Sequence, residues 1–327
     1  MSKNESIDAL PLDSNSTIEP IIINHDGSVT RLMKIPNIEP TQDPNNIVLT
    51  KDVPLNPIIN TWIRLFLPRI ALDNPKKLPL IFYYHGGGFI YFSASSTDNH
   101  NFCFKLAEKI GVVVASINYR LAPESRLPAA YEDAIEALHW LRTTNEKWVH
   151  ECCDMSNCYL MGSSAGGNIA YQAGLRCAAT VDEFDFDELK IKGLILHQPF
   201  FGGSQRTNSE LRLENDRGLP LKANDLMWEF ALPEGVGRDH KFCNPTVMDE
   251  GDDECFNEIK RLRWKILLTG CYGDPLIDRQ AEFVKMLRSK GVDVVEYFGE
   301  GFHGMELLEP SKDGPLFEQI GYFINQC

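Results

Sequence analysis

A glycine-bounded pentapeptide supplies the first candidate for chemistry. Residues 162–166 read GSSAG and fit the pattern Gly-x-Ser-x-Gly, between a short apolar segment at 159–161 and a helical pattern at 167–178. In that context the pattern is typical of a nucleophile elbow, a strand-to-helix turn so tight that the neighbouring positions must be small. Ser164 is then exposed at a helix N-terminus, which favours developing negative charge. The pattern predicts a nucleophilic serine, although a small-residue turn without chemistry also fits the pentapeptide alone.

A second glycine-rich segment follows a predicted strand at 78–84. Residues 85–89 read HGGGF, a sequence that arises by chance far less often than the serine pattern. Adjacent glycines let backbone N–H groups point into a cavity without side-chain obstruction, and acyl transfer needs such donors where an oxyanion forms. Gly87 and Gly88, with the N–H of Ala165, are therefore the predicted oxyanion hole. A phosphate-binding loop is the weaker alternative, because the Lys-Ser/Thr pair and the spacing of a P-loop are missing.

The general base is expected on a loop after a late strand. His303 lies between Gly301 and Gly304, after a predicted strand at 292–298 and before the last helical pattern. A known chain order of serine hydrolases, serine then acid then histidine, favours His303 as the base. The other histidines that were weighed are interpreted as structural or surface residues: His85, His139, His197 and His240.

Two aspartates follow the predicted strand at 265–269. Asp274 comes first and directly precedes Pro275, a natural first helical residue, so an N-cap role is also possible for it. Asp278 would lie one turn into the helix. The chain order favours Asp274 as the acid that orients His303, with Asp278 as the alternative.

Alternating apolar runs and helical patterns indicate how these residues are positioned. The predicted strands are 78–84, 112–117, 159–161, 191–196, 265–269 and 292–298, and the predicted helices are 97–109, 129–142, 167–178, 278–290 and 316–324. This alternation predicts an α/β fold, a parallel sheet with helices on both faces. Apolar alternations at 21–23, 29–33 and 62–67 predict a few antiparallel leading strands. The polar segment 202–262 interrupts the alternation of strand and helix patterns. It is interpreted as an insertion over the sheet, within one domain spanning 1–327.

Composition excludes several classes of protein. The 32 Lys and Arg residues against 46 Asp and Glu give a net charge of −14, the opposite of a nucleic-acid footprint. The chain has no apolar run of the roughly 18–20 residues that a membrane helix needs. Its polar first 20 residues do not resemble a secretion signal. With nine cysteines and no Cys-x-x-Cys pair, we expect reduced thiols, a cytoplasmic location and no metal site.

The chain resembles the plant carboxylesterases of the hormone-sensitive-lipase-like branch of the α/β-hydrolase fold. The resemblance spans nearly the whole chain and rests on these segments: 85–89 (HGGGF), 119–124 (YRLAPE), 127–133 (LPAAYED), 162–168 (GSSAGGN), 274–278 (DPLID) and His303. It implies that Ser164, Asp274 and His303 are nucleophile, acid and base, and that no cofactor is required. It also implies a cap made of an N-terminal arm, 1–45, and the insertion. Ser163 departs from the family pattern, in which many relatives carry Glu or Asp before the nucleophile.

The resemblance implies a serine carboxylesterase that acts on small esters with an apolar acyl or alcohol group. Aromatic and apolar residues near the expected pocket are the predicted substrate-binding residues: Phe89, Ile90 and Trp228, with Tyr91 and Met227 beside them. Packing of a cap helix is the alternative role for Met227 and Trp228. Two other functions stay open: a specialised-metabolism enzyme acting on an alkaloid-like scaffold, by hydrolysis with decarboxylation or by elimination or cyclisation, and a non-catalytic protein like the gibberellin receptors. The sequence does not determine the oligomeric state.

Overall fold

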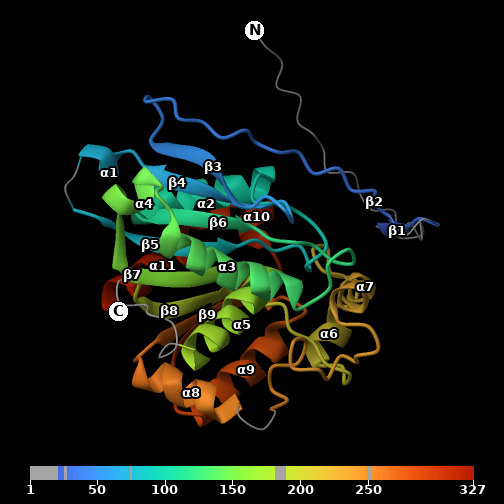
Figure 1. Ribbon diagram of the computed structural model, residues 1–327. Coiled ribbons are helices and arrows are strands. Elements are labelled where there is room, and N and C mark those ends of the chain that lie inside the picture. The colour runs from blue at the N-terminus through green and yellow to red at the C-terminus, as the bar shows by residue number, and fades with distance from the viewer. Residues whose placement is uncertain (1–20, 26–27, 74–75, 181–188, 249–251) are drawn as a thin grey trace. The chain divides into compact units, whose positions relative to one another are not determined.

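A computed structural model (Figure 1) describes residues 21–25, 28–73, 76–180, 189–248 and 252–327. The chain divides into two compact units, 1–35 and 36–327, which are described separately. In the first unit, β1 (Ile21–Ile23) and β2 (Val29–Arg31) form the predicted antiparallel pair. The polar segment at 1–20 lies outside the described residues.

The second unit is built on a mixed sheet. Among the described residues it has eight strands in the order β10-β9-β8-β7-β5-β6-β4-β3. Their bounds are β3 (Val48–Asn56), β4 (Thr61–Pro68), β5 (Leu78–Tyr84), β6 (Val113–Asn118), β7 (Cys153–Ser163), β8 (Ile191–His197), β9 (Lys265–Gly273) and β10 (Asp293–Phe302). The pairs β3–β4 and β4–β6 are antiparallel, and all the other pairs are parallel. This confirms the predicted mostly parallel sheet with antiparallel leading strands.

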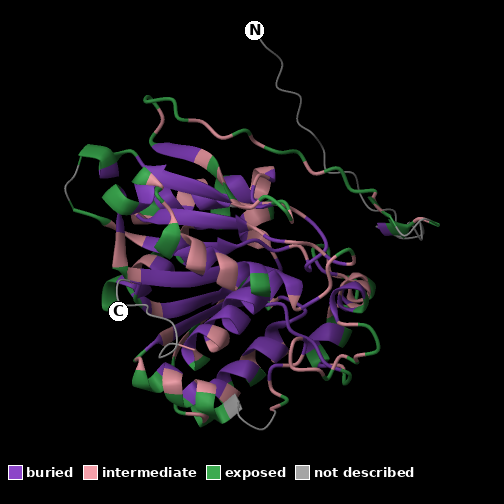
Figure 2. Cartoon of the chain, in the orientation of Figure 1, coloured by how far each residue is buried: buried purple, intermediate pink, exposed green. Residues whose placement is uncertain are grey.

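Helices cover both faces of this sheet, and strands β4 to β9 are buried along most of their length, whereas the edge strand β10 is partly buried or exposed throughout (Figure 2). One face carries α2 (Thr97–Ile110) and α11 (Gly314–Gln326), and the other carries α3 (Ala129–Thr143), α5 (Ala165–Ala179) and α9 (Ile277–Ser289). The shorter helices are α1 (Ile70–Asp73), α4 (Lys147–Cys152), α6 (Asn208–Arg212), α7 (Leu221–Ala231), α8 (Asp252–Arg261), α10 (Met305–Leu308) and a 3₁₀ turn at Pro310–Lys312. Burial on both faces explains why the parallel strands read as continuous apolar runs.

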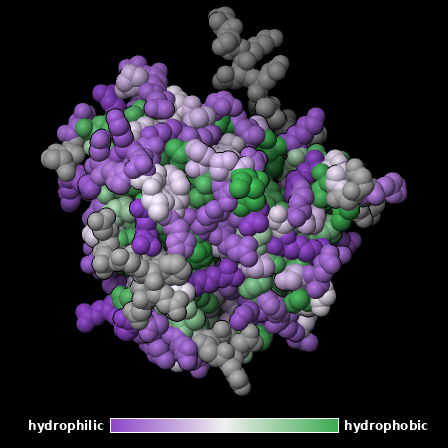
Figure 3. Space-filling view, viewed as in Figure 1, coloured by the Kyte–Doolittle hydropathy of each residue, from purple (hydrophilic) through white to green (hydrophobic). Residues whose placement is uncertain are grey.

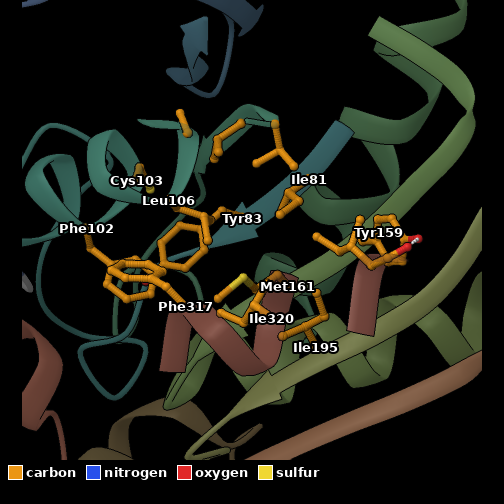
Figure 4. Close-up of a cluster of buried hydrophobic side chains, with 14 of the residues drawn as sticks. Ile81, Tyr83, Phe102, Cys103, Leu106, Tyr159, Met161, Ile195, Phe317 and Ile320 are labelled. Carbon is orange, nitrogen blue, oxygen red and sulfur yellow. Dashed lines mark hydrogen bonds between the residues drawn. The ribbon is translucent and has the colours of Figure 1, made fainter. Parts of the chain in front are cut away.

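The core beneath α2 and α11 fixes the sheet against these helices (Figure 4). Rings from the two helices, Phe102 and Phe317, lie 5.4 Å apart, and Phe102 lies the same distance from Tyr83 of β5. Strand residues of the same layer, all buried, are Ile81, Tyr159, Met161, Ile195 and Leu267. Tyr159 and Met161 alternate along β7, so this face of β7 lies on the core while its end delivers Ser164 to the edge of the sheet.

The observed elements differ from the predicted ones mainly at their ends. β3 was not predicted, because the half that follows Thr50 alternates between exposed and partly buried residues and contains Pro54. β7 begins at Cys153 rather than at 159, and β10 continues through Phe302. α5 begins at Ala165, so it includes a glycine pair whose low helix propensity concealed the start.

The surface carries no extended apolar patch in the view of Figure 3, where hydrophilic residues predominate and apolar ones lie in small separate groups. The insertion contributes α6, α7 and α8. Of these, α8 packs against α5 and so joins the helical layer on that face. Within the part of the chain that the structure describes, no helix is both long and apolar enough to cross a membrane.

Ile320→Ala tests the core layer under α11. Ile320 is fully buried, so its truncation removes apolar contacts and leaves a cavity, and we expect a loss of about 2–5 kcal/mol in the free energy of unfolding. Glu318→Ala, an exposed position on the same helix, is the control and is expected to change it by less than about 0.5 kcal/mol. Denaturant titration followed by circular dichroism measures both, and equal small losses would contradict this packing.

Candidate active site

The carboxyl ends of the parallel strands meet at one edge of the sheet, where α/β proteins place their sites. β5 ends before the HGGGF segment, and β7 ends before Ser164. β9 ends before Asp274, and β10 ends before His303. The topology thus brings four segments that are distant in sequence to the same edge.

Ser164 occupies a strained turn between β7 and α5. Its backbone has φ 55° and ψ −118°, a conformation that residues with a side chain rarely adopt. The turn is fixed by backbone hydrogen bonds: Ser164 N donates to His197 O at 2.9 Å, and Ser164 O accepts from Gly167 N and Phe200 N, each at 2.9 Å. These bonds hold the serine side chain away from the sheet, as a nucleophile elbow requires.

Glycines at 162 and 166 are required by the closeness of the backbone around the turn. A Cβ at Gly162 would overlap the backbone of Gly166, and a Cβ at Gly166 would overlap the carbonyl of Tyr84. Neither obstacle is a flexible side chain, so no rotation relieves it. The two outer positions of the Gly-x-Ser-x-Gly pattern therefore have a steric cause in this fold.

Ser164, His303 and Asp274 form a continuous line of hydrogen bonds. The distance from His303 Nε2 to Ser164 Oγ is 2.9 Å, and the distance from His303 Nδ1 to Asp274 Oδ2 is also 2.9 Å. An ionised carboxylate only accepts hydrogen bonds, so the imidazole proton lies on Nδ1 and Nε2 is left to accept from the serine hydroxyl. This arrangement can deprotonate an alcohol that attacks an electrophile.

The carboxylate of Asp274 is fully buried and has further donors. Its Oδ1 accepts from the backbone N–H of Leu276 at 2.8 Å, and its Oδ2 accepts from Gln280 Nε2 at 3.0 Å. Gln280 was not identified from the sequence. Gly270 in the middle of β9 leaves room for the Gln280 side chain, because a Cβ at position 270 would overlap its amide oxygen.

The alternative acid, Asp278, has a different partner. Its Oδ2 accepts from the backbone N–H of Ser209 at 2.8 Å, and Ser209 Oγ donates to Pro275 O at 2.7 Å. Arg279 pairs with Glu210 at 3.2 Å, and Glu210 is buried. Asp274 is thus hydrogen-bonded to His303, whereas Asp278 links α6 of the insertion to the start of α9.

The imidazole of His303 lies among three acids. Its burial lowers the pKa and is the largest single influence, but the charge of Asp274, its hydrogen bond and the charges of Asp216 and Glu306 together outweigh burial. The pKa of His303 is therefore raised above its ordinary value of 6.5. The same negative charges that raise this pKa stabilise the imidazolium that forms when the ring accepts a proton.

Two other histidines are held in structural roles. His85 is buried, stacks on Tyr119 with ring centroids 4.2 Å apart, and its pKa is lowered to about 4 by burial. His197 is bonded through Nδ1 to Thr269 Oγ1 at 2.8 Å and through Nε2 to Glu306 Oε2 at 3.0 Å. Their ring contacts are with neighbours other than Ser164, in agreement with the structural roles expected for them.

The HGGGF loop passes beside the elbow. A Cβ at Gly86 would lie 3.4 Å from the Cβ of Ser164, so the loop backbone is in contact distance of the serine. Gly87 has φ +106° and Gly88 has φ +60°, conformations that glycine adopts without strain. The side chain of Met227, from α7, lies directly against Gly88. Ala165 is the first residue of α5 and is buried.

The predicted substrate-binding residues belong to a packed aromatic group. Phe89, Ile90 and Trp228 are all at most 1% exposed. The Trp228 ring stacks on Phe200, with centroids 4.7 Å apart and planes 6° from parallel, and lies 5.6 Å from the Phe89 ring. The Phe89 and Trp228 rings thus pack against each other between the HGGGF loop and α7, while Met227, next to Trp228, is only partly buried.

Ser163, which directly precedes Ser164, forms a neutral hydrogen-bonded pair with Tyr83. Its hydroxyl accepts a hydrogen bond from Tyr83 OH at 3.0 Å, and both residues are buried. Burial raises the pKa of Tyr83 well above its ordinary value, so the phenol stays protonated and donates. The departure from the family pattern therefore leaves a satisfied neutral pair beside Ser164.

Three cysteines that lie close together in the sequence, Cys152, Cys153 and Cys158, are separate buried thiols. Cys153 Sγ is directed to Trp148 O at 3.6 Å and Cys158 Sγ to Met155 O at 3.4 Å, and burial raises the pKa of both thiols. Among the described residues, no group of three or more His, Cys, Asp or Glu side chains has the arrangement of a metal site.

The chain is similar to known proteins over most of its length. A family model described as the α/β hydrolase fold matches residues 81–307. Carboxylesterase 20 of Arabidopsis thaliana is 47% identical over 312 residues, 93% of this chain and 94% of the relative. A 3-O-acetylpapaveroxine carboxylesterase of Papaver somniferum is 46% identical over 286 residues, 84% of this chain and 90% of the relative.

Solved structures share the fold. A hyperthermophilic esterase from the archaeon Pyrobaculum calidifontis superposes with a TM-score of 0.69 at 25% identity, covering 88% of this chain and 87% of the esterase chain. The predicted α/β-hydrolase architecture is confirmed by this likeness together with the observed strand order.

The raised pKa of His303 predicts how the reactivity of Ser164 depends on pH. The neutral imidazole accepts the serine proton and the imidazolium does not, so labelling of Ser164 by a fluorophosphonate should be slow at low pH and rise through the pKa of His303. Half-maximal labelling is expected above pH 6.5, the ordinary histidine pKa. His303→Ala should abolish this pH dependence, whereas a wild-type midpoint below 6.5 would contradict the assigned electrostatics.

Proposed function

Because the chain belongs to the α/β-hydrolase family, we propose that it is a serine carboxylesterase in which Ser164 is the nucleophile, His303 the base and Asp274 the acid. The observation that carries this proposal is the unbroken hydrogen-bond line through these three side chains. Its support includes two similar carboxylesterases that match most of the chain. The intact histidine also separates this chain from the non-catalytic receptor alternative.

The first half of the reaction forms an acyl-enzyme. Ser164 Oγ attacks the ester carbonyl carbon while Nε2 of His303 takes the hydroxyl proton, and the carbonyl electron pair moves onto oxygen. Asp274 keeps Nδ1 protonated and stabilises the imidazolium. When the tetrahedral intermediate collapses, the bond to the alcohol oxygen breaks and His303 gives its proton to the leaving alcohol.

The tetrahedral oxyanion needs donors that are in place before the reaction. We assign this role to the backbone N–H groups of Gly87, Gly88 and Ala165. The closeness of Gly86 to Ser164 and the position of Ala165 at the start of α5 support the assignment. Loss of one such donor typically lowers the rate by about 10²–10³.

The second half of the reaction hydrolyses the acyl-enzyme and regenerates the free enzyme. A water molecule gives a proton to His303 and attacks the acyl carbon, and the intermediate collapses with transfer of that proton to Ser164 Oγ. The carboxylic acid leaves and the hydroxyl is restored. This cycle uses only side chains and backbone donors of this chain.

The substrate class that we propose is a small ester with an apolar acyl or alcohol group. The partly buried Met227 of α7 lies directly against Gly88 and gives the site an apolar border beside the HGGGF loop. The similarity to a 3-O-acetylpapaveroxine carboxylesterase favours simple hydrolysis among the specialised-metabolism alternatives.

A cap and a cytoplasmic location complete the proposal. We assign the cap to the N-terminal arm, 1–45, and to the insertion, 202–262, whose Met227 already contacts the oxyanion loop. The buried thiols of Cys103, Cys153 and Cys158 are not in disulfides, which supports a reducing compartment. The net charge of −14 supports a small-molecule substrate rather than nucleic acid.

Ser164→Ala tests the nucleophile. Without the hydroxyl no acyl-enzyme forms, so hydrolysis of a short-chain aryl ester should fall by roughly 10⁴-fold or more. Ser163→Ala is the matched control: it removes a neighbouring hydroxyl that is bonded to Tyr83, and it should retain activity within about tenfold.

Fluorophosphonate labelling followed by mass analysis completes that test. Wild type and Ser163→Ala should be labelled on Ser164, and Ser164→Ala should not be labelled. Retained hydrolysis by Ser164→Ala would overturn the mechanism. A folded wild-type protein that is neither labelled nor active would favour the receptor-like alternative.

Gly88→Ala tests the oxyanion loop, with Gly111→Ala as its control. Both glycines have positive φ, +60° and +74°, so each alanine is expected to lower stability by about 1–2 kcal/mol. At Gly88 the new methyl also overlaps Met227, whereas at Gly111 it meets nothing within 4 Å. Steady-state kinetics should show kcat lowered at least about tenfold for Gly88→Ala and unchanged for Gly111→Ala. Equal kcat values would contradict the assignment.

A further inference from the structure

Gln198 is a buried residue at the end of β8 that the mechanism above does not use. It is 2% exposed and directly follows His197, whose carbonyl accepts the hydrogen bond from Ser164 N. Its own backbone N–H donates to Thr269 O of β9 at 2.7 Å. Gln198 therefore lies between the strand that carries the serine and the strand that carries the acid.

The side-chain amide of Gln198 holds the histidine loop from both sides. Its Oε1 accepts from the backbone N–H of Gly304 at 2.7 Å, and its Nε2 donates to the backbone carbonyl of Phe302 at 3.2 Å. These residues immediately precede and follow His303. One amide thus fixes the two peptide groups on which the orientation of the imidazole depends.

The same amide also reaches the acid loop. Gln198 Nε2 lies 3.1 Å from Cys271 Sγ, and the carbonyl of Cys271 accepts the hydrogen bond from the backbone N–H of Asp274 at 3.0 Å. The loop that carries His303 and the loop that carries Asp274 thus both contact the buried side chain of Gln198. A displacement of either loop would change the distance between the side chains of Asp274 and His303.

The backbone of Gln198 is strained where this contact is made. Its φ of +44° is in the left-handed region, which residues with a side chain occupy only at a cost in free energy. Strain of this kind persists only where the surrounding structure imposes it, and it clusters at functional sites. Here it aims the amide at the histidine loop.

We propose that Gln198 is a positioning residue for catalysis: its amide sets the placement of His303 relative to Asp274 and Ser164. This inference rests on the proposed esterase function, in which His303 is the base. Gln198 does not contact the reacting atoms, so its contribution is expected in kcat rather than in substrate affinity. A small misplacement of a catalytic group lowers rates by up to about 10²-fold.

Gln198→Leu removes the amide and keeps a side chain of similar size. We expect kcat for a short-chain aryl ester to fall by about 10–100-fold while KM changes by less than about threefold. Gln172→Leu is the matched control, because Gln172 is also buried and bonded to a backbone carbonyl, Lys241 O, but lies along α5. It should lose comparable stability and keep the wild-type kcat.

Gln198→Glu is the second variant, because a carboxylate at 198 still accepts from Gly304 but no longer donates to Phe302. The charged and titratable groups that face His303 are Asp274 after β9, Asp216 in the insertion, Glu306 of α10 with its partner His197 of β8, and Cys271 of β9. An added negative charge favours the imidazolium and should move the acid limb of kcat/KM to higher pH. A loosened contact with Asp274 in Gln198→Leu should move it to lower pH.

Proton NMR separates this inference from the proposed function, because it needs no substrate. The Nδ1 proton of His303 should give a low-field resonance in wild type and Gln172→Leu, and a weakened or shifted one in Gln198→Leu. The proposal is supported if the acid limb of kcat/KM moves in opposite directions in Gln198→Leu and Gln198→Glu and the His303 resonance changes in Gln198→Leu. Wild-type kcat and resonance in folded Gln198→Leu overturn it, and so does a loss of kcat that the control shares. If the wild-type protein is inactive but the His303 resonance is weakened or shifted in Gln198→Leu and not in Gln172→Leu, the esterase function alone is rejected.

Discussion

The contact between His303 and Asp274 is the constraint on which the rest of the site depends. The carboxylate is fully buried, so its charge is offset only by the groups that touch it: the imidazole, the N–H of Leu276 and the amide of Gln280. In a medium of low dielectric such an ion is stable only when it is fully hydrogen-bonded. The contact that makes the imidazole a base is therefore also a condition for burying the acid.

The sequence was sufficient for the parts of the site that follow local rules. The elbow glycines were identifiable because steric closeness around a strand-to-helix turn leaves no alternative to glycine. His303 was identifiable from chain order and from its place after a late strand. The parallel sheet was identifiable because burial on both faces makes each strand an apolar run.

Other features depend on contacts between segments that no local pattern encodes. Gln280 reaches Asp274 only because α9 turns back over β9, and Gln198 reaches Phe302 only because β8 and β10 end at one edge. Edge strand β3 was not recognised, since its exposed half carries polar residues and a proline. Trp228 stacks on Phe200, a residue far from it in the sequence, so the α7 sequence alone left both substrate binding and packing open for it.

Helices α6 and α7 of the insertion are attached in different ways, and this affects which substitutions each can accept. α6 is bonded through Ser209 and Glu210 to Asp278 and Arg279 at the start of α9, which follows Asp274, so changes in α6 are expected to disturb the contact between Asp274 and His303. α7 meets the HGGGF loop through the flexible side chain of Met227, and methionine tolerates replacement by other apolar residues. Substitutions in α7 are therefore expected to change the surface beside the HGGGF loop without moving Asp274, whereas substitutions in α6 are not.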